Sequence, residues 1–158
     1  EVDLKQVLQY VCENERITAQ GREITLRTEV PDGPAVVITD GFRIRQVFEN
    51  LIENAVKYSP DESVVQISVQ TNEKMAEIII TNPGSGIAPD ALPHVFERFY
   101  HGTDSNSSGL GLYIAKSIMK NLHGDIRAES QDGLTRFTVS IANEVSDRRV
   151  DDETGTAD

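Results

Sequence analysis

The sequence predicts an α+β fold, a two-layer α/β sandwich in which a mixed, mostly antiparallel sheet of about five strands packs on three helices. Three stretches carry apolar residues at helical spacing, and several shorter ones alternate apolar with polar residues as strands do. Turn-forming sequences connect the later strands in pairs, which favours hairpins. The chain has no internal repeat of solenoid period. One sheet with helices on one face is therefore expected.

The first expected helix runs from Val2 to about Ala19, with Asp3 as its N-cap and Gly21 as its end. Its helical spacing rests on five apolar side chains: Leu4, Val7, Leu8, Val11 and Ile17. Cys12 lies in the same helix and is the single cysteine of the chain, so no intrachain disulfide can form. We expect it to act as a small core hydrophobe.

Two extended segments are expected after this helix. Ile24, Leu26 and Thr28 alternate with polar or charged residues, which is the pattern of a strand. The turn-forming sequence Pro31-Asp32-Gly33-Pro34 then precedes Val36-Val37-Ile38, which we expect to be extended as well.

The second expected helix begins at Asp40 and carries the most informative pattern in the chain. At about 100° per residue, seven apolar side chains fall on one face: Ile44, Val47, Phe48, Leu51, Ile52, Ala55 and Val56. Asn50, Asn54 and Lys57 fall within a narrow arc roughly opposite. A carboxamide oxygen suits Mg²⁺ and an ammonium suits phosphate oxygens. This face predicts a site for a magnesium-bound polyphosphate, and the alternative is a solvated helix face with a chance pair of asparagines.

The remaining elements complete the sheet and its cover. They are expected in this order: strands Val64 to Thr71 and Met75 to Thr81, a helix from Gly109 to Leu122, and strands Asp125 to Ser130 and Arg136 to Ile141. Turns at Asn72-Glu73-Lys74 and at Asp132-Gly133 make each pair of strands a hairpin.

Composition and charge limit the class of protein to which this chain can belong. The chain has 158 residues, of which 38% are hydrophobic and 26% charged, and this is typical of one globular domain. No apolar run approaches the roughly 18 residues of a membrane span, and no signal peptide opens the chain. Fifteen Lys and Arg against 26 Asp and Glu give a formal charge of −11, which opposes binding to nucleic acid. Residues 143–158 are acidic and almost without large apolar side chains, so we expect a disordered tail after a domain of residues 1–142.

Two glycine-containing turns accompany the polar helix. Asn82-Pro83-Gly84-Ser85-Gly86-Ile87 follows an apolar run, and Ser108-Gly109-Leu110-Gly111-Leu112 precedes the third expected helix. Glycine lets a ligand approach the backbone closely, and N–H groups at a helix N-terminus attract anionic oxygens. Gly109 and Gly111 are therefore interpreted as a phosphate cradle. Either glycine turn alone is weak support for a phosphate site. The occurrence of the polar helix and both glycine turns in this order separates such a site from ordinary chain turns.

With these residues in that order, the chain resembles the catalytic, ATP-binding domain of bacterial sensor histidine kinases. That domain has the Bergerat fold, in a superfamily shared with gyrase, the HSP90 chaperones and the MutL repair proteins. The resemblance covers roughly Val2 to Ala142. The N box matches Asn50 to Tyr58, the first glycine box Asn82 to Gly86, the F box Phe96 to Tyr100, and the second glycine box Gly109 to Leu112.

The resemblance implies ATP and Mg²⁺ as ligands and gives the matching residues roles. Asn54 would bind the metal with Asn50 beside it, Lys57 would reach phosphate, and Tyr58 would pack on the base. Asn82 stands where sensor kinases usually have the Asp that accepts a hydrogen bond from the adenine amino group. Selectivity for adenine over guanine is therefore expected to persist but to be weaker. The other nucleotide contacts implied are Gly84, Gly86, Ile87, Phe99, Gly109, Leu110, Gly111, Leu112 and Thr135.

The segment between Phe96 and Ser108 is the candidate ATP lid. It is rich in Ser, Asn and Gly, and we expect Phe96 and Phe99 to anchor its base in the core. Related kinases usually have a longer lid with a basic residue near the position of His101, whereas this lid has none after Arg98. An ordinary mobile loop is the alternative.

Asn50 also predicts the type of chemistry. ATPases of the superfamily have a glutamate base at this place, and an amide cannot take a proton from water. The pattern favours delivery of phosphate to a histidine on a separate dimerisation domain, with a response regulator downstream.

We expect no chemistry from His94, His101 or His123, and no acceptor histidine in this chain. The chain is then the cytoplasmic kinase domain of a membrane-anchored receptor. A nucleotide-binding pseudokinase or a stand-alone ATPase are the alternatives.

Overall fold

The structure, a computed structural model, describes residues 1–100 and 109–142. Its main sheet has five strands in the order β2-β4-β5-β7-β6. The β2-β4 pair is parallel and the other three pairs are antiparallel, which confirms the mixed, mostly antiparallel sheet. The strands are β2 Thr25–Glu29, β4 Val64–Thr71, β5 Met75–Pro83, β6 Asp125–Gln131 and β7 Leu134–Ala142.

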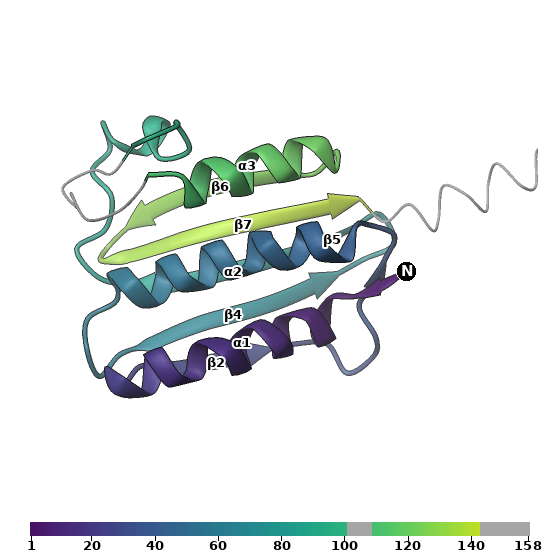
Figure 1. Ribbon diagram of the computed structural model, residues 1–158, viewed down its shortest axis with the longest axis horizontal. Coiled ribbons are helices and arrows are strands. Elements are labelled where there is room, and N and C mark those ends of the chain that lie inside the picture. Colours follow the sequence, from purple (N-terminus) through teal and green to yellow (C-terminus); the bar gives the residue numbers. More distant parts are fainter. Residues whose placement is uncertain (101–108, 143–158) are drawn as a thin grey trace, which may run out of the picture.

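The three helices lie together on one face of this sheet, so the predicted two-layer α+β sandwich is confirmed (Figure 1). They are α1 Leu4–Gly21, α2 Gly41–Tyr58 and α3 Gly111–Asn121. A short 3₁₀ helix, η1 Leu92–His94, follows β5. None of the helices in the described part of the chain is both long and apolar enough to span a bilayer.

The start of the chain differs from the prediction. The helix begins at Leu4, and Val2 belongs to a separate two-residue strand, β1 Val2–Asp3, which pairs antiparallel with β3 Val36–Val37. The reason is the cap: Asp3 adopts an extended conformation, and its carboxylate accepts a hydrogen bond of 3.0 Å from the backbone N–H of Lys5. Asp3 is thus confirmed as the N-cap.

Helix α1 buries most of the side chains that the sequence assigned to its apolar face, but Ile17 is 82% exposed. At 100° per residue, Ile17 lies about 220° around the helix from Leu4, on the far side from the sheet. The prediction that Ile17 belongs to the apolar face of this helix was therefore wrong. Cys12 is 3% exposed and belongs to the core, as expected. Burial raises the pKa of its thiol to about 11.

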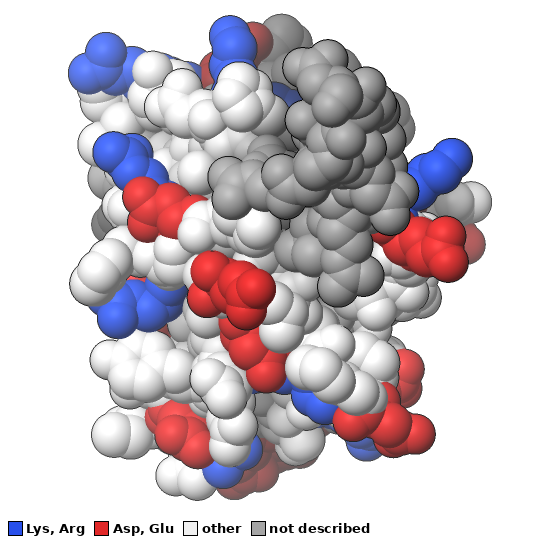
Figure 2. Space-filling model, turned by 90° about the vertical axis from the view of Figure 1, so that its right-hand side faces the viewer, with Lys and Arg blue, Asp and Glu red and all other residues white. Residues whose placement is uncertain are grey.

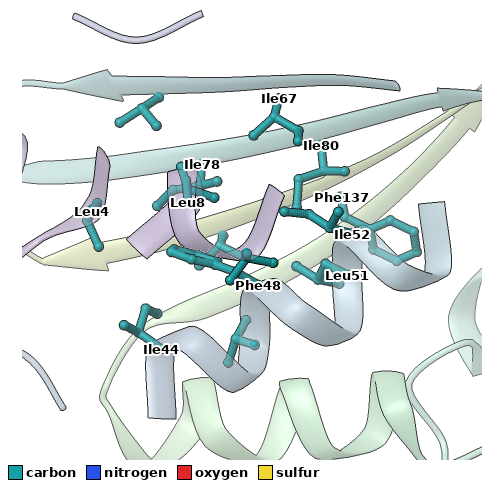
Figure 3. Close-up of a cluster of buried hydrophobic side chains, with 14 of the residues drawn as sticks. Leu4, Leu8, Ile44, Phe48, Leu51, Ile52, Ile67, Ile78, Ile80 and Phe137 are labelled. Atoms are coloured by element: carbon teal, nitrogen blue, oxygen red, sulfur yellow. The ribbon is translucent and has the colours of Figure 1, made fainter. Parts of the chain in front are cut away.

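Helix α2 is the centre of the core. All seven apolar side chains assigned to its inner face are at most 1% exposed, which confirms the predicted orientation. Figure 3 shows several of them, including Phe48 and Ile52, in one cluster with Ile78 and Ile80 of β5 and Phe137 of β7. The carboxylate of Asp40 accepts hydrogen bonds from the backbone N–H groups of Phe42 and Arg43, at 3.1 and 3.2 Å, and so begins the helix as predicted.

Both predicted hairpins are present. At the first turn, the side-chain oxygen of Asn72 accepts hydrogen bonds from the backbone N–H groups of Lys74 and Met75 at 2.8 and 2.9 Å. At the second turn, Asp132 and Gly133 have φ values of 54° and 74°, the left-handed pair of a two-residue hairpin turn. The candidate lid from residue 101 onward and the acidic tail lie outside the described residues.

Candidate functional site

Motifs that are far apart in the sequence meet at one end of the sandwich, on the left in Figure 1. This end contains the last turn of α2, the end of β5, the β6-β7 turn and the start of α3. The antiparallel register of β5 and β7 sets Asn82 opposite Thr135. The sheet therefore brings the first glycine box beside the β6-β7 turn, and Gly84 also lies close to the carbonyl of Tyr58 at the end of α2.

Asn50 joins the N box to the second glycine box. Its side-chain N–H donates a hydrogen bond of 3.1 Å to the backbone carbonyl of Gly111, the first residue of α3. This bond sets the orientation of the amide, because the oxygen then points away from that carbonyl. Asn54 follows one turn later and is half-buried like Asn50.

Lys57 and Tyr58 occupy the exposed last turn of α2. The Lys57 ammonium lies 5.4 Å from the centre of the Tyr58 ring, and Tyr58 is 43% exposed. An open aromatic face can stack on a base, and an ammonium can pair with phosphate oxygens. The two side chains thus provide two chemically different contacts side by side.

Asn82 is buried at the end of β5, with only 3% of its surface exposed. Its side-chain N–H donates to the carbonyl of Pro83 at 3.0 Å. The amide oxygen is left to accept a hydrogen bond from a ligand. Thr135, its neighbour on β7, is 7% exposed and places a hydroxyl beside it.

Gly84 is wedged between α2 and the final hairpin. Its N–H donates to the carbonyl of Gly133 at 3.0 Å, and a Cβ at this position would lie 2.8 Å from the carbonyl oxygen of Tyr58. With φ at +150°, the backbone is also in a region that other residues rarely adopt. Gly84 of the first glycine box is therefore required by the fold itself.

Ser130 is a member of the site that sequence reasoning missed. Its hydroxyl accepts a hydrogen bond of 2.8 Å from the backbone N–H of Ile87 and lies 3.5 Å from the hydroxyl of Thr135. A Cβ on Gly86 would come within 2.8 Å of the same hydroxyl. No local pattern in the sequence marks this serine, because Ile87, the backbone partner of its hydroxyl, follows β5 and lies 43 positions away in the sequence.

The F box meets the second glycine box through the backbone. Phe96 is partly buried and packs edge-to-face on Phe137, with ring centres 6.0 Å apart. Phe99 is 55% exposed, so the expectation that it anchors the lid in the core was wrong. Its N–H donates to the carbonyl of Gly109 at 2.9 Å, and a Cβ on Gly109 would lie 2.6 Å from the Phe99 carbonyl carbon. Phe99 thus meets the second glycine box through its backbone, while the centre of its ring lies 4.8 Å from the guanidinium of Arg98.

The start of α3 has a glycine, Gly111, with open space beside it in the part of the chain that the structure describes. Among residues 1–100 and 109–142, nothing lies within 4 Å of the position of a Cβ on Gly111, and its backbone is helical. Leu110 is the N-cap residue, without a side-chain cap, and Leu112 packs partly against the core. Open space beside a helix N-terminus is the kind of place where an anion can bind.

His94 and His123 do not belong to this group of residues. The Nδ1 atom of His94 lies 2.6 Å from a carboxylate oxygen of Glu97 on the surface, and His123 follows the far end of α3. His101 lies outside the described residues.

The residues present fit a magnesium-bound nucleotide. In residues 1–100 and 109–142, no three His, Cys, Asp or Glu side chains gather to hold a metal. Mg²⁺ commonly takes few protein ligands and completes its shell with water and substrate phosphates. The amide oxygen of Asn50, oriented by the bond to Gly111, and that of Asn54 suit that need, and the open space at Gly111 suits the phosphates.

Two hollows lie away from this site, at the end of the molecule that Figure 2 shows. One of about 350 Å³ is lined by Lys116, Lys120 and His123, and one of about 460 Å³ by Tyr10 and Phe42 among others. None of the predicted site residues lines either hollow. On this face, Lys and Arg are scattered among Asp and Glu (Figure 2).

Comparison with known proteins decides the family. The profile described as "Histidine kinase-, DNA gyrase B-, and HSP90-like ATPase" matches residues 39–145. The chain belongs to this family. Within it, the chain is a catalytic ATP-binding domain of the bacterial sensor histidine kinase type.

Individual relatives agree with this assignment. The sensor-like histidine kinase SenX3 of Mycolicibacterium smegmatis is 34% identical over 146 residues, which cover 89% of this chain and 38% of SenX3. The mycobacterial sensor histidine kinase MprB superposes with a TM-score of 0.79 at 29% identity, covering 89% of this chain and 95% of the solved chain. ShkA, solved at full length in complex with AMPPNP, gives a TM-score of 0.79 at 25% identity, covering 89% of this chain and 30% of ShkA. The chain thus spans less than half the length of SenX3.

Proposed function

We propose that this domain binds Mg-ATP and supplies the γ-phosphate to a histidine on a separate dimerisation and phosphoacceptor domain, in two-component signal transduction. The proposal is supported by membership of the histidine kinase, gyrase and HSP90-like family and by the meeting of the N box and both glycine boxes at one end of the sheet. The solved complex of ShkA with AMPPNP, a relative of the same fold, supports ATP as the nucleotide.

One observation carries the choice of phosphate delivery over ATP hydrolysis. Asn50 stands on the site face of α2, and its amide N–H donates to the carbonyl of Gly111. An amide held in this way cannot take a proton from an attacking water, as a catalytic carboxylate would. A domain without a base at this position is suited to holding ATP while another group attacks the γ-phosphate.

The side chains of α2 would divide the work of holding the nucleotide. The oxygens of Asn54 and Asn50 would hold Mg²⁺, which when bound neutralises charge on the phosphate oxygens. Lys57 would pair with a phosphate, and the exposed ring of Tyr58 would cover one face of the base. The N–H groups at the start of α3, with Gly111 leaving space beside them, would bind the remaining phosphate oxygens.

Asn82 would select adenine. Because its side-chain N–H donates to the Pro83 carbonyl, its oxygen would be the atom that accepts a hydrogen bond from the adenine amino group. Guanine has a carbonyl in that place, and accepting it would require the amide to flip and give up the bond to Pro83. Such a loss costs about 0.5–1.5 kcal/mol. Thr135 and Ser130 would support this end of the pocket.

The same family supports a proposal about the phosphoacceptor histidine and about the protein to which this domain would belong. We propose that the chain is the cytoplasmic kinase domain of a membrane-anchored receptor, comprising residues 1–142. The phosphoacceptor histidine would lie in the part of the relatives that this chain does not span, and a response regulator would receive the phosphate next.

The test is transfer of label to an added acceptor. The chain is incubated with γ-labelled ATP and Mg²⁺, alone and with a purified phosphoacceptor hairpin from a closely related kinase such as SenX3. We expect acid-labile, base-stable label on the hairpin and none on the chain alone, and Asn54→Ala should abolish transfer. Such label on His94, His101 or His123 of the isolated chain would contradict the proposal.

A pseudokinase is the second candidate, and the neutral Asn82 favours it because an amide binds the adenine amino group less strongly than a carboxylate. ATP binding without transfer to any matched hairpin would support this candidate. A stand-alone ATPase would instead release phosphate without a hairpin, and the release would be lost on substitution of Asn50.

A further inference from the structure

Arg22 connects the end of α1 to the end of α2. It is the C-cap residue of α1, and its side chain reaches across to the last turn of α2. One guanidinium nitrogen donates to the carbonyl of Val56 at 2.6 Å and to that of Lys57 at 3.3 Å. The other terminal nitrogen donates to the carbonyl of Ser59. A single side chain thus binds three backbone carbonyls at the end of the helix that carries the site.

This contact supplies what the end of a helix lacks. The last four carbonyls of an α-helix have no partner within the helix, and the helix dipole favours a cation at this end. The carbonyl of Ala55 is already bound by the N–H and the hydroxyl of Ser59, at 3.1 and 2.7 Å. Arg22 binds the next two carbonyls and supplies the positive charge. A planar guanidinium can span several carbonyls in one orientation, which an ammonium cannot.

The same turn forms one wall of the nucleotide site. Lys57 and Tyr58 project from it, and the carbonyl of Tyr58 lies against Gly84 so closely that a Cβ would come within 2.8 Å. A shift of this turn would therefore move two proposed ligand contacts and press on the first glycine box. We propose that Arg22, which lies outside all the family motifs, is a positioning residue that holds the last turn of α2 in its nucleotide-binding geometry. The inference rests on the proposed nucleotide binding.

The side chain of Arg22 can be changed without breaking the backbone contacts around it. The N–H of Glu62 donates to the carbonyl of Arg22 at 3.0 Å, and the N–H of Thr25 donates to that of Ser63 at 2.9 Å. These bonds do not involve the guanidinium. Asp61 lies 2.9 Å from the Arg22 Nε atom, but its side chain is 72% exposed, and an ion pair of this kind contributes little.

The experiment is a calorimetric titration of the full chain with AMPPNP and Mg²⁺. Arg22→Gln should weaken binding by about tenfold, which is about 1.4 kcal/mol. Arg22→Lys keeps the charge without the fork and should fall between Arg22→Gln and the parent. Asp61→Asn removes only the exposed ion pair and should stay within about twofold of the parent. In hydrogen exchange without nucleotide, the amides of Tyr58, Ser59 and Asp61 should exchange faster in Arg22→Gln.

A matched control separates positioning from general stability. Ile44 is fully buried at the opposite end of α2, about 20 Å along the helix from Tyr58. Ile44→Val should lower the melting temperature and leave AMPPNP affinity unchanged. The inference is overturned if Arg22→Gln binds within about twofold of a parent that binds, or if Ile44→Val weakens binding as much as Arg22→Gln does. A parent that binds no nucleotide would overturn the proposed function itself, and the parent titration tells the two failures apart.

Discussion

Asn50 on α2 donates its side-chain N–H to the carbonyl of Gly111 on α3 across 3.1 Å, between residues 61 positions apart. The bond joins the two segments to which the sequence assigns the metal and the phosphates. It also fixes which atom of the Asn50 amide remains for binding a metal. The oxygen of Asn50, a ligand that suits Mg²⁺, is the one that faces away from Gly111.

Asn50→Asp tests this bond in the absence of nucleotide. A carboxylate has nearly the shape of the amide but cannot donate, so two oxygens would face each other at Gly111. We expect a loss of about 1–3 kcal/mol in the free energy of unfolding, compared with about 1 kcal/mol for Asn50→Ala, which removes the bond without repulsion. Urea unfolding of both variants measures the difference. Equal losses would mean that the carbonyl of Gly111 does not need this donor.

Gly84→Ala and Gly111→Ala should separate a structural glycine from a ligand-binding one. Gly84→Ala places a Cβ 2.8 Å from the Tyr58 carbonyl in a strained conformation and should lower the free energy of unfolding by about 1–3 kcal/mol. Gly111 has open space, so Gly111→Ala should leave stability equal or higher by about 0.5–1 kcal/mol. Its added methyl group should nevertheless weaken AMPPNP binding. Thermal unfolding with and without nucleotide measures both effects, and undiminished binding by Gly111→Ala would remove Gly111 from the site.

Asn82 should decide between adenine and guanine. Asn82→Leu removes the acceptor oxygen and should weaken ATP by about 1–3 kcal/mol, because the adenine amino group is then buried without a partner. GTP should bind the parent more weakly than ATP, and Asn82→Asp should raise the preference for ATP. Competition titrations with both nucleotides give these values. If both variants matched the parent for ATP and GTP, another residue would have to read the base.

Glu15 on α1 should make stability depend on pH. Burial raises the pKa of its carboxyl above the usual 4.5, and the carboxylates of Glu53 and Glu49 raise it further. The folded chain then holds this proton more tightly than the unfolded chain, so its contribution to stability falls as pH rises from the usual value through the raised pKa. Glu15→Gln should therefore melt at a higher temperature than the parent near neutral pH, and not below about pH 4.

The matched control for Glu15 is Glu13→Gln, at an exposed position on the same helix. It should change the melting temperature little at either pH. A Glu15→Gln variant that gains as much stability in acid as at neutral pH would show that the gain does not come from relief of the carboxylate charge.

Short-range patterns predicted most of the fold. The apolar stripe of α2, its cap at Asp40 and both hairpin turns depend on residues within a few positions of one another, and each was confirmed. Ile17 shows where such a pattern misleads, because an apolar residue can occur on the solvent side of a helix. Val2 was misassigned because its partner, Val37, is distant in the sequence.

The residues of the candidate site were predictable only where several polar side chains lie close together within one sequence motif. Asn50, Asn54 and Lys57 could be grouped because they share one side of one helix. Ser130 and Arg22 could not, since their partners come from other elements and are mostly backbone atoms, which carry no sequence signal. Phe99 was misplaced for a related reason: its backbone, rather than its ring, makes the contact with Gly109.

The most direct test of the account is a calorimetric titration with AMPPNP, in buffer with Mg²⁺ and in buffer with a chelator. The chain should bind at least about tenfold more tightly with Mg²⁺, a difference of about 1.4 kcal/mol. Asn54→Ala should lose this dependence on the metal. Gln46→Ala, which removes an exposed carboxamide elsewhere on α2, should keep it. A chain that binds no nucleotide, or an Asn54→Ala variant with undiminished Mg²⁺ dependence, would contradict the proposed Mg-ATP site.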